Sequence, residues 1–168
     1  MSMICILIRV TNEQLQNFLQ NSSLLEEFVD SEDIHESDNL LDIDKSWDAI
    51  NFLLTGHALD TIEQAEPPLS KIIFSGQVID EEQDMGYGPA HYLTTEQVKE
   101  ISAALSKISD SDLLKRYDGK KMNEKGVYPQ IWEKDEDVSE YLADNYKELK
   151  AFYTKAAQEG HSIVTYIS

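Results

Sequence analysis

The stretch that decides the fold is Asp44-Lys45-Ser46-Trp47-Asp48-Ala49-Ile50-Asn51-Phe52-Leu53-Leu54-Thr55-Gly56. Its first carboxylate can accept the free backbone N–H groups of a first helical turn, and its charge suits the positive end of the helix dipole. The apolar residues recur at intervals of three and four, and further apolar residues widen that face. Gly56 fits the left-handed residue that commonly ends a helix. We therefore predict a core helix, capped by Asp44 and covered by protein on more than one side.

The whole chain has the length and composition of one globular domain. It holds 168 residues, of which 41% are hydrophobic and 27% charged, so we interpret residues 1–168 as a single domain. No apolar run approaches the roughly 20 residues of a membrane span, and the first residues lack the features of a signal peptide. Cys5 is the sole cysteine, which excludes an internal disulfide. A cytoplasmic protein is therefore expected.

Acidic residues dominate the charge. The net charge is -18, and residues 1–60 hold 12 acidic residues against Arg9 and Lys45. Such a field repels nucleic acid and anionic membrane surfaces, so we expect neither as a partner. It attracts a basic protein, because opposite fields steer association; a small molecule is the other partner that we consider. Solubility alone is the simpler explanation of the same charge.

Both ends of the chain predict β-strands. Residues 4–10 form a continuous apolar run, which is typical of a strand buried on both faces. Residues 162–167 predict a second strand, which we place beside the first. Residues 71–75 predict a further strand, whereas the acidic segment 30–39 predicts an exposed loop with His35 on the surface.

Three helix starts are predicted by capping boxes, in which a Ser or Thr and a Glu or Gln three residues later satisfy each other's backbone N–H groups. The pairs are Thr11 with Gln14, Ser23 with Glu26, and Thr94 with Gln97. Together with the strands, these helices predict an α+β fold. We expect one small mixed or antiparallel sheet that includes both terminal strands, packed by about five to seven helices.

The longest helix is predicted from Glu136 to about residue 158, with Asp135 as its cap. Its apolar stripe includes Tyr146 and Tyr153, and Tyr141 could join these two in an exposed aromatic face. Because tyrosine has a polar tip, we expect this stripe to be only partly buried. An exposed aromatic face would suit self-association, so a homo-oligomer is one expected assembly.

Four motifs occur in order along nearly the whole chain. They are Asp44-Lys45-Ser46-Trp47 running to Leu54-Thr55-Gly56, then Tyr87-Gly88-Pro89-Ala90-x-Tyr92-Leu93, then Tyr128-Pro129-x-x-Trp132, and finally Phe152-Tyr153-x-x-Ala156-Ala157-x-x-Gly160. In these motifs the chain resembles the YfbM-like family, a bacterial domain of unknown function. The resemblance implies a single α+β domain in the bacterial cytoplasm and supplies no activity. It also implies arginine where this chain has His91, which weakens any proposal that a fixed cation at position 91 is essential.

Signatures of metal and cofactor chemistry are missing from the sequence. The four histidines are scattered and there is one cysteine, without H-E-x-x-H or C-x-x-C spacing, so no metal site is expected. There is no G-x-S-x-G motif and no phosphate-cradling glycine loop. The segment Gly86-Tyr87-Gly88 is too short for a dinucleotide fingerprint, and no cofactor is expected.

One set of residues is a candidate site without a known motif. If the glycine–proline turn packs over the start of the core helix, these side chains would line a pocket with aromatic walls and polar tips. The candidates are Asp44, Lys45, Trp47, Tyr87, His91 and Tyr92. Within that pocket His91 would act as an acid or base, oriented by Asp44 or Asp48. The simpler interpretation is that Lys45 pairs with nearby acids and Tyr87 packs in the interior.

Two functions follow from these features. The first is a non-catalytic, acidic binding protein, for which a basic protein partner is physically favoured. The alternative is a small hydrolase or transferase with a pocket around the Asp44–Trp47 helix start and the Tyr87–Tyr92 turn.

Overall fold

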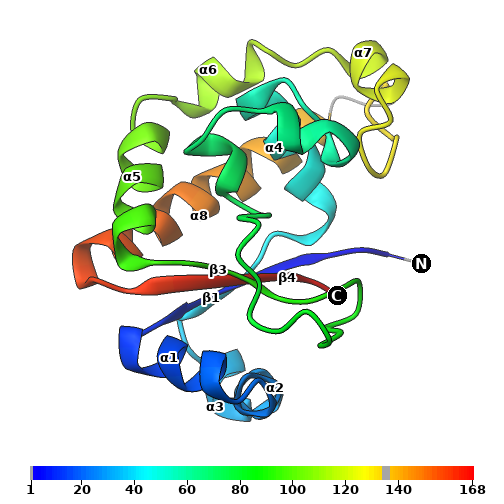
Figure 1. The fold of residues 1–168 in the computed structure, drawn as a ribbon. Coiled ribbons are helices and arrows are strands. Elements are labelled where there is room, and N and C mark those ends of the chain that lie inside the picture. Colours follow the sequence, from blue (N-terminus) through cyan, green and yellow to red (C-terminus); the bar gives the residue numbers. More distant parts are fainter. Residues whose placement is uncertain (1, 134–136) are drawn as a thin grey trace.

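The computed structural model describes residues 2–133 and 137–168. A four-stranded antiparallel sheet lies between two layers of helices (Figure 1). The strand order is β2-β1-β4-β3. The strands are β1 (Cys5–Val10), β2 (Leu40–Asp42), β3 (His91–Leu93) and β4 (Ser162–Ile167). The predicted α+β fold, with both terminal strands in one small sheet, is confirmed.

The two terminal strands form the centre of the sheet. They pair antiparallel over their full length, from Cys5 with Ile167 to Val10 with Ser162. Every residue of β1 and β4 is buried, as the continuous apolar run of residues 4–10 predicted. Because side chains alternate between the faces, one set of these residues packs under each helical layer.

The larger layer covers one face of the sheet and contains the core helix (Figure 1). Its elements are the 3₁₀ turn η1 (Asp44–Ser46), α4 (Trp47–Thr55), the 3₁₀ turns η2 (Leu59–Gln64) and η3 (Leu69–Lys71), α5 (Thr95–Leu105), α6 (Asp110–Leu114), α7 (Gly119–Glu124) and α8 (Asp137–Glu159). The smaller layer on the other face contains α1 (Asn12–Gln20), α2 (Ser23–Asp30) and α3 (Glu32–Glu36). In the described residues, no helix has the length and apolar character needed to cross a membrane.

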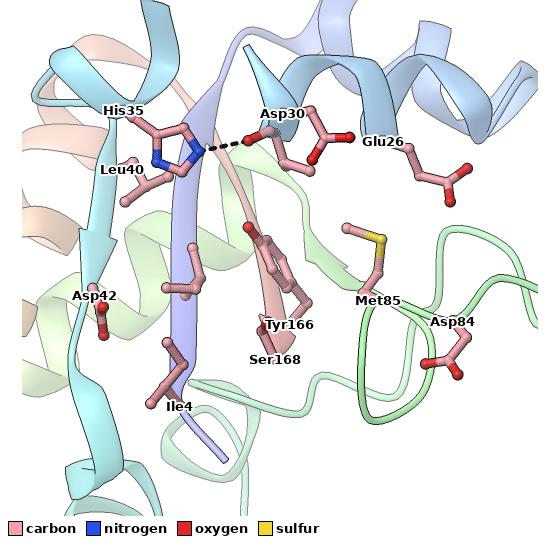
Figure 2. Close-up of a pocket in the computed structure, with 12 residues that line it drawn as sticks. Ile4, Glu26, Asp30, His35, Leu40, Asp42, Asp84, Met85, Tyr166 and Ser168 are labelled. Atoms are coloured by element: carbon pink, nitrogen blue, oxygen red, sulfur yellow. Dashed lines mark hydrogen bonds between the residues drawn. The ribbon is translucent and has the colours of Figure 1, made fainter. Parts of the chain in front are cut away.

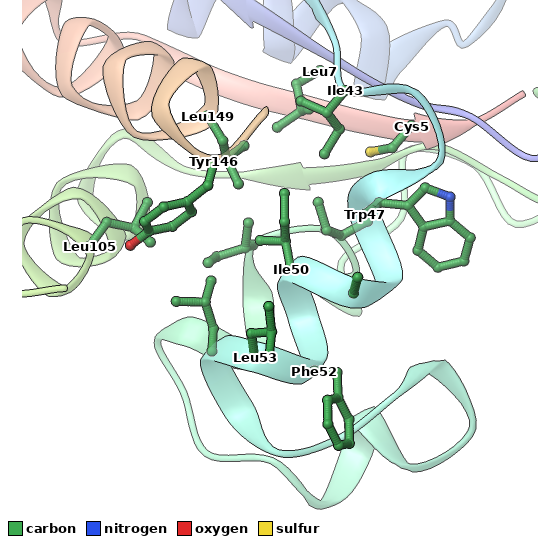
Figure 3. Packing of buried hydrophobic residues seen from close by; sticks show 14 of the residues in the cluster. Cys5, Leu7, Ile43, Trp47, Ile50, Phe52, Leu53, Leu105, Tyr146 and Leu149 are labelled. Atoms are coloured by element: carbon green, nitrogen blue, oxygen red, sulfur yellow. The ribbon is translucent and has the colours of Figure 1, made fainter. Parts of the chain in front are cut away.

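Helix α4 is buried on more than one side, as its sequence predicted, and its side chains pack in the larger core cluster (Figure 3). Every residue from Trp47 to Leu54 is buried, and Trp47 has an exposed fraction of 0%. Each large apolar side chain buried here contributes roughly 1.5–3 kcal/mol to folding. Gly56 ends the helix with a φ of 82°, in the left-handed region.

The predicted capping role of Asp44 is wrong. The 3₁₀ turn η1 precedes α4, so the α-helix begins only at Trp47. Asp44 itself has a φ of 53°, and its carboxylate accepts the hydroxyl of Tyr141 at 2.6 Å. The Asp44 carboxylate, which was predicted to accept backbone N–H groups of the helix start, thus accepts a hydroxyl from the distant helix α8.

The predicted strand at residues 71–75 is also wrong. Ile72 and Ile73 are buried, but their carbonyl groups accept hydrogen bonds from side chains and not from the backbone of a neighbouring strand. The Tyr153 hydroxyl donates to the carbonyl of Ile72 at 2.7 Å, and the Thr165 hydroxyl donates to that of Ile73 at 2.5 Å. The segment therefore crosses the interior without joining the sheet.

Two predictions in the smaller layer need correction. Residues 30–39 are not simply a loop, because α3 forms there and buries Ile34, although His35 is exposed as predicted. The Ser23–Glu26 capping box is absent, since Ser22 is the cap residue of α2 and makes no capping bond. The Ser22 hydroxyl donates instead to Asp80 at 2.7 Å.

Of the three tyrosines expected to form an exposed aromatic face on the long helix, Tyr141 is half-buried and the other two are enclosed. Tyr146 and Tyr153 both have an exposed fraction of 0%. Their hydroxyls reach the carbonyls of Ile108 and Ile72, which satisfies the polar tips inside the protein. The predicted cap Asp135 lies outside the described residues.

Candidate functional site

An open pocket of about 470 Å³ lies between the sheet and helices α2 and α3 (Figure 2). Its floor is one row of three adjacent strands, because Ile6 pairs with Asp42 on one side and with Tyr166 on the other. Side chains in such a row share one face of the sheet. The floor thus presents a carboxylate, an aliphatic group and a phenol in sequence.

Four carboxylates surround this pocket, which we call the acidic pocket. Glu26 and Asp30 come from α2, Asp42 from the end of β2, and Asp84 from the loop before β3. Within the described part of the chain, none of the four forms an ion pair. Among the described residues that line the pocket, His35 is the one basic side chain.

The loop that carries Asp84 is held by glycine geometry. Asp84 Oδ1 accepts the backbone N–H groups of Gly86 at 2.8 Å and Gly88 at 3.2 Å. Gly86 has a φ of 133°, and a Cβ atom there would lie 2.9 Å from the Cα of Ser168. Only glycine therefore lets this turn pack against the end of β4, which fixes Asp84 at the edge of the pocket.

Tyr166 supplies the phenol of the floor. Its exposed fraction is 8%, and its hydroxyl makes no hydrogen bond with any residue that the structure describes. Burial, and then the charge of Asp30, raise the pKa of Tyr166 to about 12, so the group stays neutral. The ring is largely covered by protein, and the Tyr166 hydroxyl points into the pocket, where it is accessible to a ligand (Figure 2).

His35 uses one ring nitrogen to hold the pocket wall. Its Nε2 atom lies 2.7 Å from the carbonyl oxygen of Val29, to which it donates because a carbonyl oxygen can only accept (Figure 2). This bond ties α3 to the end of α2. The second ring nitrogen remains available to the pocket or to solvent.

The sequence-predicted residues at the start of the core helix are used in packing. The Tyr141 hydroxyl donates to Asp44 and accepts the backbone N–H of Lys45 at 3.1 Å. Burial, then Asp44, raise the pKa of this phenol well above its ordinary value. The ammonium group of Lys45 forms no ion pair within residues 2–133 and 137–168, contrary to the simpler interpretation of that residue.

Trp47 is enclosed by protein. Its Nε1–H donates to the carbonyl of Met3 at 2.9 Å, and its ring stacks on Tyr128 at a centroid distance of 5.4 Å. The Trp47 ring also makes an edge contact with the Phe74 ring, at a centroid distance of 5.7 Å. Phe74 in turn contacts the ring of His91 at 5.5 Å. Asp48 does not reach His91, because its carboxylate accepts backbone N–H groups elsewhere.

His91 lines a second cavity, of about 500 Å³, with residues of η2 and η3. Its Nδ1 accepts the backbone N–H of Gly76 at 3.2 Å, so the neutral ring carries its proton on Nε2. Burial lowers the pKa of His91 below its ordinary value. In this arrangement Nε2 can donate a hydrogen bond but cannot accept a proton.

Tyr87 and Tyr92 make their hydrogen bonds with residues outside the start of the core helix. Tyr87 has an exposed fraction of 40%, contrary to the interior packing expected as the simpler interpretation, and its backbone N–H donates to Ile167 at 3.1 Å. The carbonyl of Tyr92 accepts the Ser75 hydroxyl at 2.7 Å. No hydrogen bond in the described structure joins the Tyr87–Tyr92 turn to the residues of η1, so the two halves of the sequence-predicted site make separate contacts.

The chain matches the family model described as a domain of unknown function (DUF1877) over residues 1–166. It belongs to this family. The crystal structure of YfbM from Escherichia coli, a protein of unknown function, is similar, with a TM-score of 0.73 at 19% identity. The match covers 98% of this chain and 99% of that one, which confirms the YfbM-like resemblance and, at this identity, shows the fold alone. No curated protein matches the chain.

The acidic pocket of this DUF1877 chain was missed by sequence reasoning. Alternation along residues 162–167 places Tyr166 on the same face as Val164, which is a signal that the sequence contains. The register that puts Asp42 and Tyr166 on either side of Ile6 is a tertiary property. The sequence therefore predicts which face of the strand Tyr166 occupies, but not which side chains lie next to it.

Proposed function

We propose that this chain is a non-catalytic binding protein that takes the cationic groups of a partner into the acidic pocket. The observation that carries the proposal is a pocket lined by four carboxylates, none of which forms an ion pair with a described residue. The Tyr166 hydroxyl also reaches this pocket. Ammonium and guanidinium groups donate to both kinds of oxygen. The partner is a basic protein that presents lysine or arginine side chains, or a small cationic molecule.

The placement of these acids lowers the stability of helix α2. Glu26 and Asp30 are four positions apart, so like charges face each other on one side of the helix. Asp30 is also the last residue of α2, where the negative end of the helix dipole disfavours an acid. A bound cation would relieve both effects, which supports a role in binding over a role in folding.

The charge of the whole chain supports the same proposal. At -18, the field of the protein attracts cations before contact and concentrates them near the surface. Binding of this kind weakens as salt rises, because exposed charges are screened over about 10 Å at 0.1 M ionic strength.

A titration with a tetralysine peptide tests the proposal. Isothermal titration calorimetry at low and high salt would compare the native chain with the double variant Glu26→Gln/Asp30→Asn. The matched control is Asp144→Asn/Glu148→Gln, which removes two charges from exposed positions of α8 in the other layer. We expect salt-sensitive binding that the pocket variant weakens roughly tenfold and the control weakens little. Equal losses in the two variants, or binding that ignores salt, would contradict the proposal.

The alternative function is a small hydrolase or transferase that uses the cavity beside His91. The cavity also contains Ser70, whose exposed fraction is 4% and whose hydroxyl makes no hydrogen bond in the described structure. With its proton on Nε2, His91 would act there as a hydrogen-bond donor to a substrate oxygen. A screen of ester and phosphate substrates with the native chain and His91→Ala tests this alternative, which predicts turnover that the variant lacks.

A further inference from the structure

We infer that the acidic pocket takes a linear aliphatic polyamine, a methylene chain that carries ammonium groups at both ends. The inference rests on the proposed function, because it names the ligand of the same pocket. It follows from three properties of the pocket: the separation of its carboxylates, the apolar surface between them, and the Tyr166 hydroxyl, which reaches the pocket without a protein partner among the described residues.

The carboxylates of the pocket do not converge on one point. Asp42 lies on one side of the pocket, and Glu26 and Asp84 lie on the other, with Tyr166 between them (Figure 2). No three acidic, histidine or cysteine side chains within the described residues are arranged to hold a metal ion. Separate anionic groups of this kind suit a ligand whose positive charges are also separate.

The surface between these carboxylates is apolar. Ile4 and Ile6 form the floor beside Asp42, Leu40 is the first residue of β2, and Met85 lies next to Asp84. Two strand spacings separate Asp42 from Tyr166, a span of about 10 Å. Methylene groups of an alkyl amine can cover this surface while the ammonium groups reach the carboxylates, as the stems of lysine side chains do.

Tyr166 provides the evidence that a ligand belongs in the pocket. The residue has an exposed fraction of 8%, and its hydroxyl reaches the pocket without a protein hydrogen-bond partner in the described part of the chain. An ammonium group at this position would donate to the phenol oxygen, and the phenol would keep its proton for a neighbouring carboxylate. The volume of about 470 Å³ falls in the usual range of roughly 300–1,000 Å³ for small-molecule sites.

Calorimetric titration of the intact chain with spermidine, putrescine, n-butylamine and Mg²⁺ tests the inference. We expect affinity to fall from the triamine to the diamine and then to the monoamine, because each lost ammonium group leaves one carboxylate unpaired. Mg²⁺ should bind more weakly than spermidine, although it carries a similar charge. Binding of n-butylamine or Mg²⁺ as tight as that of spermidine would overturn the inference.

Single variants at the two ends of the pocket locate the ligand. Asp42→Asn and Asp84→Asn each remove one charge, and the amide oxygen of the second still accepts the N–H groups of Gly86 and Gly88. Each should weaken spermidine binding by roughly threefold to fivefold, whereas Asp144→Asn on α8 should leave it unchanged. Tyr166→Phe should weaken it by about fivefold without loss of folding, as circular dichroism would verify. Equal effects of pocket and control variants would contradict the inference.

The failure of this inference can be told apart from the failure of the proposed function. Suppose that the tetralysine peptide binds and that Glu26→Gln/Asp30→Asn lowers its affinity, but that spermidine binds no better than n-butylamine. The polyamine inference is then wrong and the proposed function stands. If the double variant binds both the peptide and spermidine as tightly as the native chain does, the proposed function and the polyamine inference are both wrong.

Discussion

The backbone N–H of Tyr128 donates to Asp48 Oδ2 at 2.9 Å, across 80 positions of the chain. Asp48 Oδ1 accepts the backbone N–H of Leu59 at 2.8 Å, so one carboxylate on the core helix fixes two irregular segments. Asp48 has an exposed fraction of 1%, and burial raises its pKa from 3.8 to about 6 although both hydrogen bonds lower it.

This pKa makes folding stability depend on pH with a defined sign. The folded chain binds the Asp48 proton more tightly than the unfolded chain does, so the contribution of Asp48 to stability is largest below its unfolded pKa of 3.8 and falls as the pH rises toward 6. Asp48→Asn should lower the free energy of unfolding by about 1–3 kcal/mol, because one of the two backbone N–H groups then faces an amide NH₂ group, which cannot accept its hydrogen bond. Urea denaturation between pH 4 and 7 would measure this cost, which should be larger at pH 4. A cost that stays constant over this range would contradict the prediction.

The loop that positions Asp84 depends on Gly86 more than on Gly88. Both have positive φ, at 133° and 97°, but only a Cβ at Gly86 would meet the backbone of Ser168. Gly88→Ala should destabilise the chain by about 1 kcal/mol through backbone strain. Gly86→Ala should cost about 1–3 kcal/mol more through overpacking. Thermal unfolding of the two variants checks this difference, and equal losses would show that the close approach to β4 is unimportant.

His91 should titrate below the ordinary histidine pKa of about 6.5. Its ring is partly buried, and protonation of Nδ1 would break the hydrogen bond from Gly76. Since the folded chain then binds this proton less tightly than the unfolded chain, stability should fall as the pH drops below that value. NMR titration of the imidazole nitrogens, assigned with His91→Ala, measures the midpoint. A midpoint at or above 6.5 would contradict the prediction.

The local sequence predicted those parts of the fold that depend on neighbouring residues. The Thr11–Gln14 and Thr94–Gln97 capping boxes are both present, as is the glycine that ends α4. The pairing of the two terminal strands could also be predicted, because continuous apolar runs need burial on both faces. Such elements satisfy their own polar groups or bury their own side chains.

The predictions that failed depended on distant partners. The carboxylate of Asp44, predicted to cap the core helix, instead accepts the hydroxyl of Tyr141. The carbonyl of Ile72 is bound by Tyr153, which removes the segment from the sheet. The acidic pocket could not be predicted for the same reason, since its members are brought together by strand register and by a loop. The local sequence pattern does not indicate which distant side chain will form a hydrogen bond with a given polar group.

Asp30 offers a test in which stability and binding should move in opposite directions. Its charge lies at the unfavourable end of α2, opposite Glu26, so Asp30→Asn should raise the free energy of unfolding by about 0.3 kcal/mol. The same change should weaken tetralysine binding, because the pocket loses a carboxylate. Chemical denaturation and calorimetry measure the two effects on one sample.

Asp33 is the matched control for this test. It lies in the first turn of α3, where the helix dipole favours an acid, and it does not line the acidic pocket. Asp33→Asn should therefore lower stability slightly and leave tetralysine binding nearly unchanged. If Asp30→Asn instead lowered stability and left binding intact, its carboxylate would be a structural group, and the pocket would lose the argument that its charges serve a ligand.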